Sequence, residues 1–236
     1  MLRLVLFDLD GTLIRSHNGF IPFNQAIEKT FGIPGDIRTV IPDGNTDPVI
    51  LEDIFSAANV KVDITVEQWR AFAENLHQSY AQTIQQGITR LMSLPGVLQL
   101  VQELDDREGV HQGVVTGNLE VTSKLKLETV GLSPYLNLGA YGSDSRNRGD
   151  LPRIAKDRWE RTLGTSLAPE HCVIVGDTPK DLAAARQNQM KCLLVGTGRY
   201  PVEELELFEP DATLPDFTDT QASVETLLSC TMAERS

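Results

Sequence analysis

The 236-residue sequence predicts an α/β fold in which a parallel, Rossmann-like sheet flanked by helices carries an inserted module of helices alone. Three observations predict it. Short apolar runs alternate with longer segments of helical periodicity, as in chains that build a parallel sheet with right-handed crossovers. One long block interrupts this alternation and contains helical patterns only. Several apolar runs end in Asp, Thr or Gly, where open parallel sheets bind ligands.

Four segments have the largely apolar composition of strands that are buried on both faces of a sheet. Each of them is followed directly by Gly, Thr or Asp. These segments are residues 2–7, 110–115, 172–175 and 192–195, and weaker strand patterns lie at residues 138–141 and 212–214.

Helical periodicity fills the segments between these strands. Val97, Val101 and Leu104 recur with the i, i+4, i+7 spacing of a stripe that is buried against a sheet. Two further patterns have the same character: Val121 with Leu125 and Leu132, and Leu182 with Ala185 and Arg186.

The block of residues 16–92 contains three successive helical patterns and no convincing buried strand. The patterns span residues 23–31, 46–58 and 66–86. The last pattern has four large side chains on one face, which predict a hydrophobic core for the block in preference to a platform for a substrate: Trp69, Phe72, Leu76 and Tyr80.

The sequence Leu94-Pro95-Gly96 marks the return to the alternating pattern. We therefore predict two domains. Residues 1–15 and 93–236 form the α/β domain, and residues 16–92 form the helical domain. The polar tail after Cys230 is expected to fray.

The composition is that of an ordinary globular protein, with 41% hydrophobic and 23% charged residues. The net charge of −12 argues against nucleic-acid partners, which need a basic surface. No stretch approaches the roughly 18 apolar residues of a membrane helix, so we expect no membrane partner either. An acidic protein can still bind a phosphorylated metabolite where a metal ion and a few cations are focused at one site. The sequence leaves the oligomeric state open.

The cysteines indicate a reducing compartment. Cys172 and Cys192 lie inside apolar runs, where a small buried hydrophobic residue is the ordinary interpretation. With Cys230 they show no CxxC spacing and no disulfide framework, so we expect a cytoplasmic location. The N-terminal apolar run is interrupted by Asp8 and Asp10, which argues against a signal-peptide core.

Three predicted strands end in polar residues of kinds that carry chemistry. Because the carboxyl ends of parallel strands meet at one edge of a sheet, we expect these residues to lie close together. They are Asp8-Leu9-Asp10-Gly11-Thr12, Thr116-Gly117-Asn118, and Gly176-Asp177-Thr178-Pro179-Lys180-Asp181.

Four carboxylates would then converge at this edge. A single Asp at a strand end is most often a helix cap, and Asp177 before Thr178-Pro179 fits that interpretation. Two strands that both end in paired Asp are harder to explain this way, because neighbouring carboxylates repel one another. A divalent cation with oxygen ligands removes that repulsion, so Mg²⁺ is the expected cofactor.

These segments resemble the motifs of the haloacid dehalogenase superfamily, in its phosphoglycolate phosphatase-like branch. Residues 8–12 resemble the DxDGT nucleophile motif, residues 115–118 the second motif, and residues 176–181 the fourth. The helical block resembles the α-helical cap domain of this superfamily. The resemblance covers nearly the whole chain, and the five-residue first motif is its most specific part.

The resemblance implies a role for each residue of the first two motifs. Asp8 would attack phosphorus, and Asp10 would serve as acid and then as base. Gly11 would let the backbone pass close to the phosphate, and Thr12 would supply a structural hydroxyl. The second motif would donate hydrogen bonds to phosphoryl oxygens, from Thr116 and from the backbone of Gly117 and Asn118.

The resemblance also implies the ligands of Mg²⁺. Asp8, the backbone carbonyl of Asp10 and Asp177 would hold the ion, with Asp181 binding it directly or through water. The ion would neutralise charge between the anionic nucleophile and the anionic phosphate.

The third motif is where the sequence departs from the superfamily, because the usual lysine followed by proline is missing from residues 143–152. We expect Arg148 to supply the stabilising cation, since it stands at the corresponding helix start. Arg146, Arg153 and Lys156 are its rivals, and Arg148 as a solvated surface residue is a further alternative.

In the helical block, residues 43–47 (Asp-Gly-Asn-Thr-Asp) resemble the turn with which related phosphatases reach over the substrate. Asn45 and Thr46 would then contact the substrate. The alternative is a cluster of N-cap residues that opens the helix predicted at Thr46. Both interpretations stay open at this point.

The expected function is hydrolysis of a small phosphorylated metabolite through an aspartyl-phosphate intermediate. Phosphoglycolate or a sugar phosphate would be typical of the superfamily. Asp10 argues against a haloalkanoate dehalogenase, which has no leaving alkoxide to protonate. A phosphomutase of the same superfamily and a non-catalytic Mg²⁺-dependent phosphoacceptor module remain as alternatives.

Overall fold

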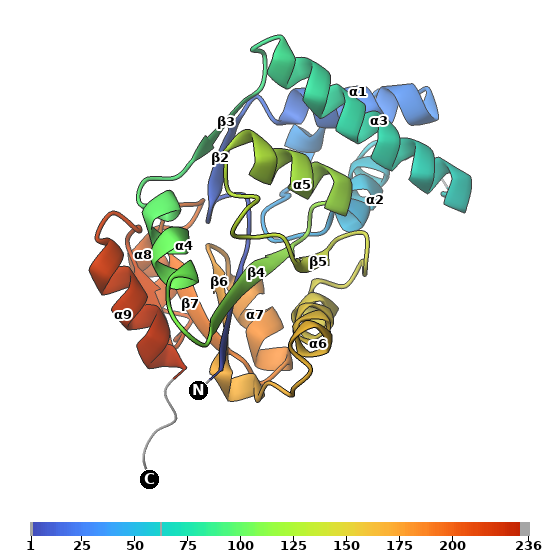
Figure 1. The fold of residues 1–236 in the computed structure, drawn as a ribbon. Helices are drawn as coiled ribbons and strands as arrows, with labels where there is room; N and C mark the ends of the chain where they lie inside the picture. The colour runs from blue at the N-terminus through green and yellow to red at the C-terminus, as the bar shows by residue number, and fades with distance from the viewer. Residues whose placement is uncertain (1, 62, 232–236) are drawn as a thin grey trace.

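The computed structural model describes residues 2–61 and 63–231, and its centre is a six-stranded parallel sheet (Figure 1). The strand order is β5-β4-β1-β6-β7-β8. The predicted fold class is confirmed, and the two weaker strand predictions are confirmed with it. The strands are β1 (Arg3–Phe7), β4 (Val110–Thr116), β5 (Gly139–Tyr141), β6 (Cys172–Gly176), β7 (Lys191–Val195) and β8 (Ala212–Leu214).

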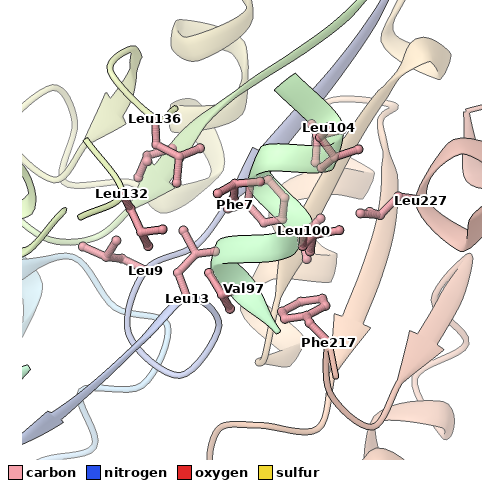
Figure 2. Close-up of a cluster of buried hydrophobic side chains, with 14 of the residues drawn as sticks. Phe7, Leu9, Leu13, Val97, Leu100, Leu104, Leu132, Leu136, Phe217 and Leu227 are labelled. Atoms are coloured by element: carbon pink, nitrogen blue, oxygen red, sulfur yellow. The ribbon is translucent and has the colours of Figure 1, made fainter. Parts of the chain in front are cut away.

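The central strand β1 is apolar almost throughout because both faces of the sheet are covered. Val5 and Phe7 belong to one hydrophobic cluster, and Leu4 and Leu6 belong to another on the opposite face. Figure 2 shows the first cluster, where Phe7 lies among side chains of α4 and α9. The first cluster draws on α4 (Val97–Asp105), α5 (Glu120–Thr129) and α9 (Thr220–Cys230), and the second on α6 (Leu151–Leu163), α7 (Pro179–Gln187) and α8 (Val202–Glu206).

The predicted stripe on α4 is confirmed, since Val97, Val101 and Leu104 are fully buried. The predicted stripe at Val121 is wrong, because Val121 is 42% exposed. Helix α5 does not lie on the sheet as α4 does, because it also contacts α3. Leu119, its N-cap residue, and Leu125, near its middle, pack into the core of the helical module. The buried face of α5 therefore differs from the predicted one, and it is largely polar: Thr122, Ser123, Lys126 and Leu127.

Three helices form a separate module beside one end of the sheet (Figure 1). The helices have a hydrophobic cluster of their own, in which Phe72 contacts Phe23 edge to face at 5.6 Å and Trp69 at 6.0 Å. Residues expected in the core of the module, Phe72 and Leu76 above all, are buried there. The helices are α1 (Phe20–Phe31), α2 (Asp47–Ala57) and α3 (Val66–Gln85), with the short 3₁₀ helix η1 (Ile37–Thr39) between the first two.

Two short antiparallel strands, β2 (Ile14–His17) and β3 (Arg90–Ser93), connect this module to the sheet. They were not expected, because each has only four residues and alternates between more and less exposed positions. They lie across the predicted boundaries at residues 15–16 and 92–93, which stay a prediction.

Within the described part of the chain, no helix combines the length and the hydropathy that crossing a bilayer requires. The predicted fraying of the tail after Cys230 falls, apart from Thr231, outside the described residues.

Candidate active site

The end of β1 delivers Asp8 to the carboxyl edge of the sheet. Asp8 is buried, and its backbone N–H donates to the carbonyl of Val175 at 2.8 Å, which continues the sheet by one residue. The turn that follows passes Asp177 so closely that a Cβ atom at Gly11 would lie 2.4 Å from its Oδ2. Gly11 also has φ +89°, a conformation that favours glycine. Thr12 donates from Oγ1 to Asp177 Oδ1 at 3.1 Å, so the first and fourth motifs meet directly.

Asp8, Asp177 and Asp181 form a cluster of buried carboxylates. One oxygen from each lies within 4.8 Å of the other two. Burial raises the pKa of Asp8 to about 6. Burial, and then repulsion by Asp8 and Asp181, raises the pKa of Asp177 to about 8. A cation bound at this cluster would therefore favour the ionised forms of Asp8 and Asp177.

Arg148 supplies one positive charge to this cluster. Its Nη2 lies 3.0 Å from Asp8 Oδ1 and 2.5 Å from Asp181 Oδ1, and its side chain is 9% exposed. Burial disfavours the charged form, but the carboxylates of Asp181 and Asp8 outweigh burial and hold the pKa of Arg148 above its ordinary value. Its Nε has no hydrogen-bond partner among the described residues.

Arg148 reaches the cluster from the short 3₁₀ helix η2 (Arg148–Asp150), which directly precedes α6. The structure places the three rival cations elsewhere, each paired with an acidic side chain outside the cluster. Arg146 pairs with Glu52, Arg153 with Asp157, and Lys156 with Glu160.

The side chain of Asp10 points away from the carboxylate cluster toward α5. Its Oδ2 accepts from Lys126 Nζ at 2.6 Å and from Asn118 Nδ2 at 2.8 Å, and its Oδ1 accepts from Ser16 Oγ at 3.1 Å. Burial under the module raises the pKa of Asp10, but the charge of Lys126 and these hydrogen bonds outweigh burial and bring it below its ordinary value. The side chain keeps 39% of its surface accessible, so it remains open to a ligand.

Lys126 is a site residue that the sequence analysis missed. Its side chain is 3% exposed, and Nζ also donates to Asn118 Oδ1 at 2.7 Å. Burial lowers the pKa of Lys126, but the charge of Asp10 outweighs burial and raises it above its ordinary value. A usable signal was present in the sequence: Thr122 and Lys126 are four residues apart and so lie on one side of α5, directly after the Thr116-Gly117-Asn118 motif.

The end of β4 brings Thr116, Gly117 and Asn118 to the same edge. Thr116 is buried, and its Oγ1 accepts from the backbone N–H of Asn118 at 3.3 Å and from Asn118 Nδ2 at 3.1 Å. Gly117 faces the helical module: a Cβ atom there would lie 1.9 Å from the carbonyl oxygen of Asn45. Its own carbonyl accepts from the N–H of Asp47 at 2.7 Å.

Residues 43–47 bridge the module and the α/β domain. Asn45 Oδ1 accepts from Lys180 Nζ, and Thr46 Oγ1 donates to the carbonyl of Arg146 at 2.8 Å. Asp47 Oδ2 accepts from the N–H of Leu119, at the start of α5, at 2.8 Å. Thr46 has the extended backbone of an N-cap residue, but its side chain makes no capping hydrogen bond.

A cavity of about 200 Å³ lies where the module meets the sheet edge. From the α/β domain it is lined by Asp8, Asp10, Thr116, Gly117, Asn118, Lys126, Arg148, Asp177 and Thr178. Six of the sequence-predicted residues at the three strand ends therefore face one space, whereas Gly11, Thr12 and Asp181 do not line it. Tyr80 belongs to the core of the module and also lines this cavity, with Lys126 Nζ 5.3 Å from the centre of its ring.

Comparison with known proteins agrees with this arrangement. Residues 2–188 match the family model of the haloacid dehalogenase-like hydrolases. The phosphoglycolate phosphatase of Photorhabdus laumondii is 25% identical, covering 94% of this chain and 92% of the relative. Pyrophosphatase PpaX of Oceanobacillus iheyensis is 21% identical, covering 92% and 94%. A hydrolase structure from Pseudomonas syringae superposes with a TM-score of 0.69 at 22% identity, covering 95% and 98%, and shows the likeness of fold.

Proposed function

The chain belongs to the haloacid dehalogenase-like hydrolase family, and from this premise we propose that it is a phosphatase that acts on a small phosphorylated metabolite through an aspartyl phosphate at Asp8. The observation that carries the proposal is the position of Asp8. It belongs to the carboxylate cluster, pairs with Arg148, and lines the same small cavity as the strand end at Thr116. The names of the curated relatives support a phosphatase.

The proposed chemistry has two displacements. One Oδ of Asp8 forms a bond to phosphorus while the bond from phosphorus to the ester oxygen breaks, and the ester oxygen takes a proton from Asp10. Water then attacks the aspartyl phosphate and gives a proton to Asp10, which releases phosphate and restores the Asp8 carboxylate. Two displacements replace one difficult direct attack by water.

Lys126 and Asn118 hold the Asp10 carboxylate toward the cavity, in place for both proton transfers. The ion pair favours ionised Asp10, which is the form that accepts a proton from water. The arrival of a phosphate dianion beside Asp10 raises the pKa of this carboxyl and favours the protonated form that the first displacement needs. Asp10 is thus placed to alternate between the two forms as the charge beside it changes.

The transferring phosphoryl group would be bound by donors from three elements. Thr116 Oγ1 accepts hydrogen bonds from Asn118, which leaves its own hydrogen free to donate. The backbone N–H of Gly117 and the guanidinium of Arg148 would add further donors to the equatorial oxygens. Gly11 keeps the turn after Asp8 clear of side-chain atoms.

The carboxylate cluster fits Mg²⁺, which prefers oxygen ligands. Asp8, Asp177 and Asp181 would hold the ion together with the backbone carbonyl of Asp10. Burial first, and then repulsion between the carboxylates, raises the pKa values of Asp8 and Asp177, and a bound cation would oppose both effects. When bound, the ion would neutralise charge between Asp8 and the substrate phosphate.

We place the protein in a reducing cytoplasm. The proposal is supported by three cysteines that are all free, of which Cys172 and Cys192 are buried. Burial raises the pKa of Cys172 to about 12, so its thiol stays protonated and inert.

The test is cleavage of p-nitrophenyl phosphate in the presence of Mg²⁺, with Asp8→Asn as the matched variant. We expect repeated turnover by the wild-type protein, a phosphoenzyme that can be trapped in acid, and loss of both in Asp8→Asn. The amide is nearly isosteric with the carboxylate but cannot attack phosphorus. Activity of Asp8→Asn within tenfold of the wild type would exclude Asp8 as the nucleophile. Labelling of one equivalent without turnover would indicate a phosphoacceptor module instead.

A further inference from the structure

The part of the cavity that would receive the leaving group has a wall of apolar side chains from the helical module. This wall is made by Phe23, Ile37, Pro42, Ile50 and Leu76, with the ring of Tyr80 beside them. Such a wall removes water from whatever part of the substrate lies against it. A charged group there would need a partner of opposite charge to offset the loss of hydration.

No cation in the described lining of the cavity is left free to pair with an anionic group. Among the described residues that line the cavity, the cations are Lys126 and Arg148, and both are already paired with carboxylates of the catalytic edge. Lys180 and Arg199, which reach the module from the α/β domain, do not line the cavity in the described structure. Lys180 donates to Asn45, and Arg199 to Asp43.

The charge that the module contributes beside this wall is negative. Asp47 lines the cavity and is 6% exposed, and its carboxylate accepts a hydrogen bond from the backbone N–H of Leu119. A carboxylate or second phosphate on the leaving group would be repelled by Asp47. An ammonium group could pair with Asp47 only in competition with Lys126, which already acts on Asp47 from within the same cavity and would repel a second cation. Both signs of charge are therefore disfavoured.

The size of the cavity also limits the leaving group. Its volume of about 200 Å³ has to hold the phosphoryl group as well, and it is smaller than the roughly 300–1,000 Å³ typical of pockets for drug-sized ligands. A nucleotide or a large sugar does not fit a space of this size.

We infer that the substrate is the phosphate monoester of a compact, uncharged alcohol whose carbon atoms lie against Phe23, Ile37 and Ile50. This inference rests on the proposed phosphatase function and adds the substrate class to it. It separates this chain from the compounds named for its relatives, since phosphoglycolate and pyrophosphate both carry a second anionic group.

The first experiment compares three monoesters of similar size in Mg²⁺: propyl phosphate, 2-phosphoglycolate and O-phosphoethanolamine. We expect kcat/KM for propyl phosphate to be at least tenfold higher than for either charged ester. Cleavage of 2-phosphoglycolate or O-phosphoethanolamine at an equal or higher kcat/KM would overturn the inference. Cleavage of p-nitrophenyl phosphate that depends on Asp8 would leave the proposed function standing in that case. Absence of turnover with every ester would overturn the proposed function, and the inference with it.

The second experiment changes the charge of the wall. Ile37 is half-buried in η1, at the edge of the module, so a longer side chain can be accommodated there. Ile37→Lys is expected to raise the ratio of kcat/KM for 2-phosphoglycolate over propyl phosphate at least fivefold, because it supplies the missing cation. Ile37→Met, of similar length but uncharged, is the matched control and should leave the ratio within twofold. An unchanged ratio in a folded Ile37→Lys protein would show that the leaving group does not lie against this wall, which would overturn the inference.

Discussion

Lys126 carries a full charge into a space that is almost closed to water, and it does so without being part of the predicted motifs. A buried ammonium is tolerated only where carboxylate and carbonyl oxygens replace water. Asp10 and Asn118 supply those oxygens at 2.6 and 2.7 Å. In return, Lys126 fixes the direction of the Asp10 carboxylate, so we regard it as a positioning residue.

We predict that Lys126→Met lowers kcat at least tenfold with little change in KM, because Asp10 loses the partner that directs it. The unfolding free energy should fall by about 1–3 kcal/mol, between the values for exposed and buried pairs, since Asp10 is partly accessible. Steady-state kinetics and urea unfolding measure both effects. Lys124→Met is the matched control, because Lys124 lies on the same helix and its pair with Glu120 is exposed. Lys126→Arg should restore part of kcat; a loss of stability without a loss of kcat would limit Lys126 to a structural role.

Asp47 gives the protein a pH dependence that can be measured apart from activity. Burial raises the pKa of Asp47 to about 6, above the 3.8 of the unfolded chain. The folded state therefore favours the protonated carboxyl. This contribution to stability is fully present below about pH 3.8 and is lost as the pH rises to about 6.

We predict that Asp47→Asn gains stability relative to the wild type as the pH rises, because the amide stays neutral and can still accept from the N–H of Leu119. The difference in unfolding free energy between variant and wild type should grow by about 1–2 kcal/mol from pH 4.5 to pH 7.5. Urea unfolding at the two pH values measures it. An equal difference at both pH values would mean that ionised Asp47 is not destabilising in the fold.

At the scale of elements, the sequence predicted a helix or strand best where all residues of the segment lie in one kind of environment. Strand β1 is buried on both faces, so its composition alone identifies it. Helix α5 was predicted with the wrong buried face, because it packs partly against the sheet domain and partly against the module. The apolar pattern of Val121 and Leu125 predicts that their side of the helix is buried. In the structure the buried stripe is instead the polar one that includes Lys126.

Other elements could not be predicted from local pattern for a different reason. Strands β2 and β3 pair with each other across more than seventy residues of chain, as in the register of Ser16 with Leu91. Neither segment has enough apolar residues to signal a strand alone. Arg148 could be preferred over its rivals only by its place before α6; the carboxylates that surround it come from distant strand ends.

The turn between β4 and α5 is the element against which the module closes. A Cβ atom at Gly117 would lie 1.9 Å from the carbonyl oxygen of Asn45 and 2.8 Å from the Cα of Thr46. Both neighbours are backbone atoms, which cannot move aside as the end of a flexible side chain can. The hydrogen bond from the N–H of Asp47 to the carbonyl of Gly117 depends on the same close approach.

We predict that Gly117→Ala displaces residues 43–47 from the sheet edge and opens the cavity. The kcat/KM for a small alkyl phosphate should fall at least tenfold, and amide hydrogen exchange in residues 43–47 should become faster. Exchange in β7, which two strands of the sheet separate from β4, should stay unchanged. Unaltered exchange at residues 43–47 would mean that the module closes without this contact.

At the scale of the whole molecule, the positions of the motifs predicted that their residues meet at one edge of the sheet, because the carboxyl ends of parallel strands lie at the same edge. The structure brings the strand ends of β1, β4 and β6 together there, since β1 pairs with β4 on one side and β6 on the other. The position of the module over that edge depends on contacts between segments far apart in the chain, such as Thr46 with Arg146. No local pattern in the sequence encodes those contacts.

The carboxylate cluster links the stability of the whole molecule to a metal ion. The fold brings Asp8 together with Asp177 and Asp181, from which it is far apart in the unfolded chain, so a cation that binds the cluster binds the folded state preferentially. Such binding adds RT ln(1 + [Mg²⁺]/Kd) to the unfolding free energy, about 2.7 kcal/mol when the concentration is a hundred times Kd. For a chain of this length, that corresponds to roughly 5–10 °C in Tm.

We therefore predict that Mg²⁺ raises Tm by several degrees, that EDTA removes both this gain and the phosphatase activity, and that added Mg²⁺ restores both. Ca²⁺ should restore activity poorly, because it takes more ligands at longer distances. Asp177→Asn should lose most of the thermal gain, since it removes one ligand charge from the cluster. Asp47→Asn, which removes a buried carboxylate outside the cluster, should keep the gain in full and serves as the control. A gain in Tm that is as large in Asp177→Asn as in the wild type would place the bound ion away from Asp177 and contradict the proposed metal site, whatever the effect of that substitution on activity.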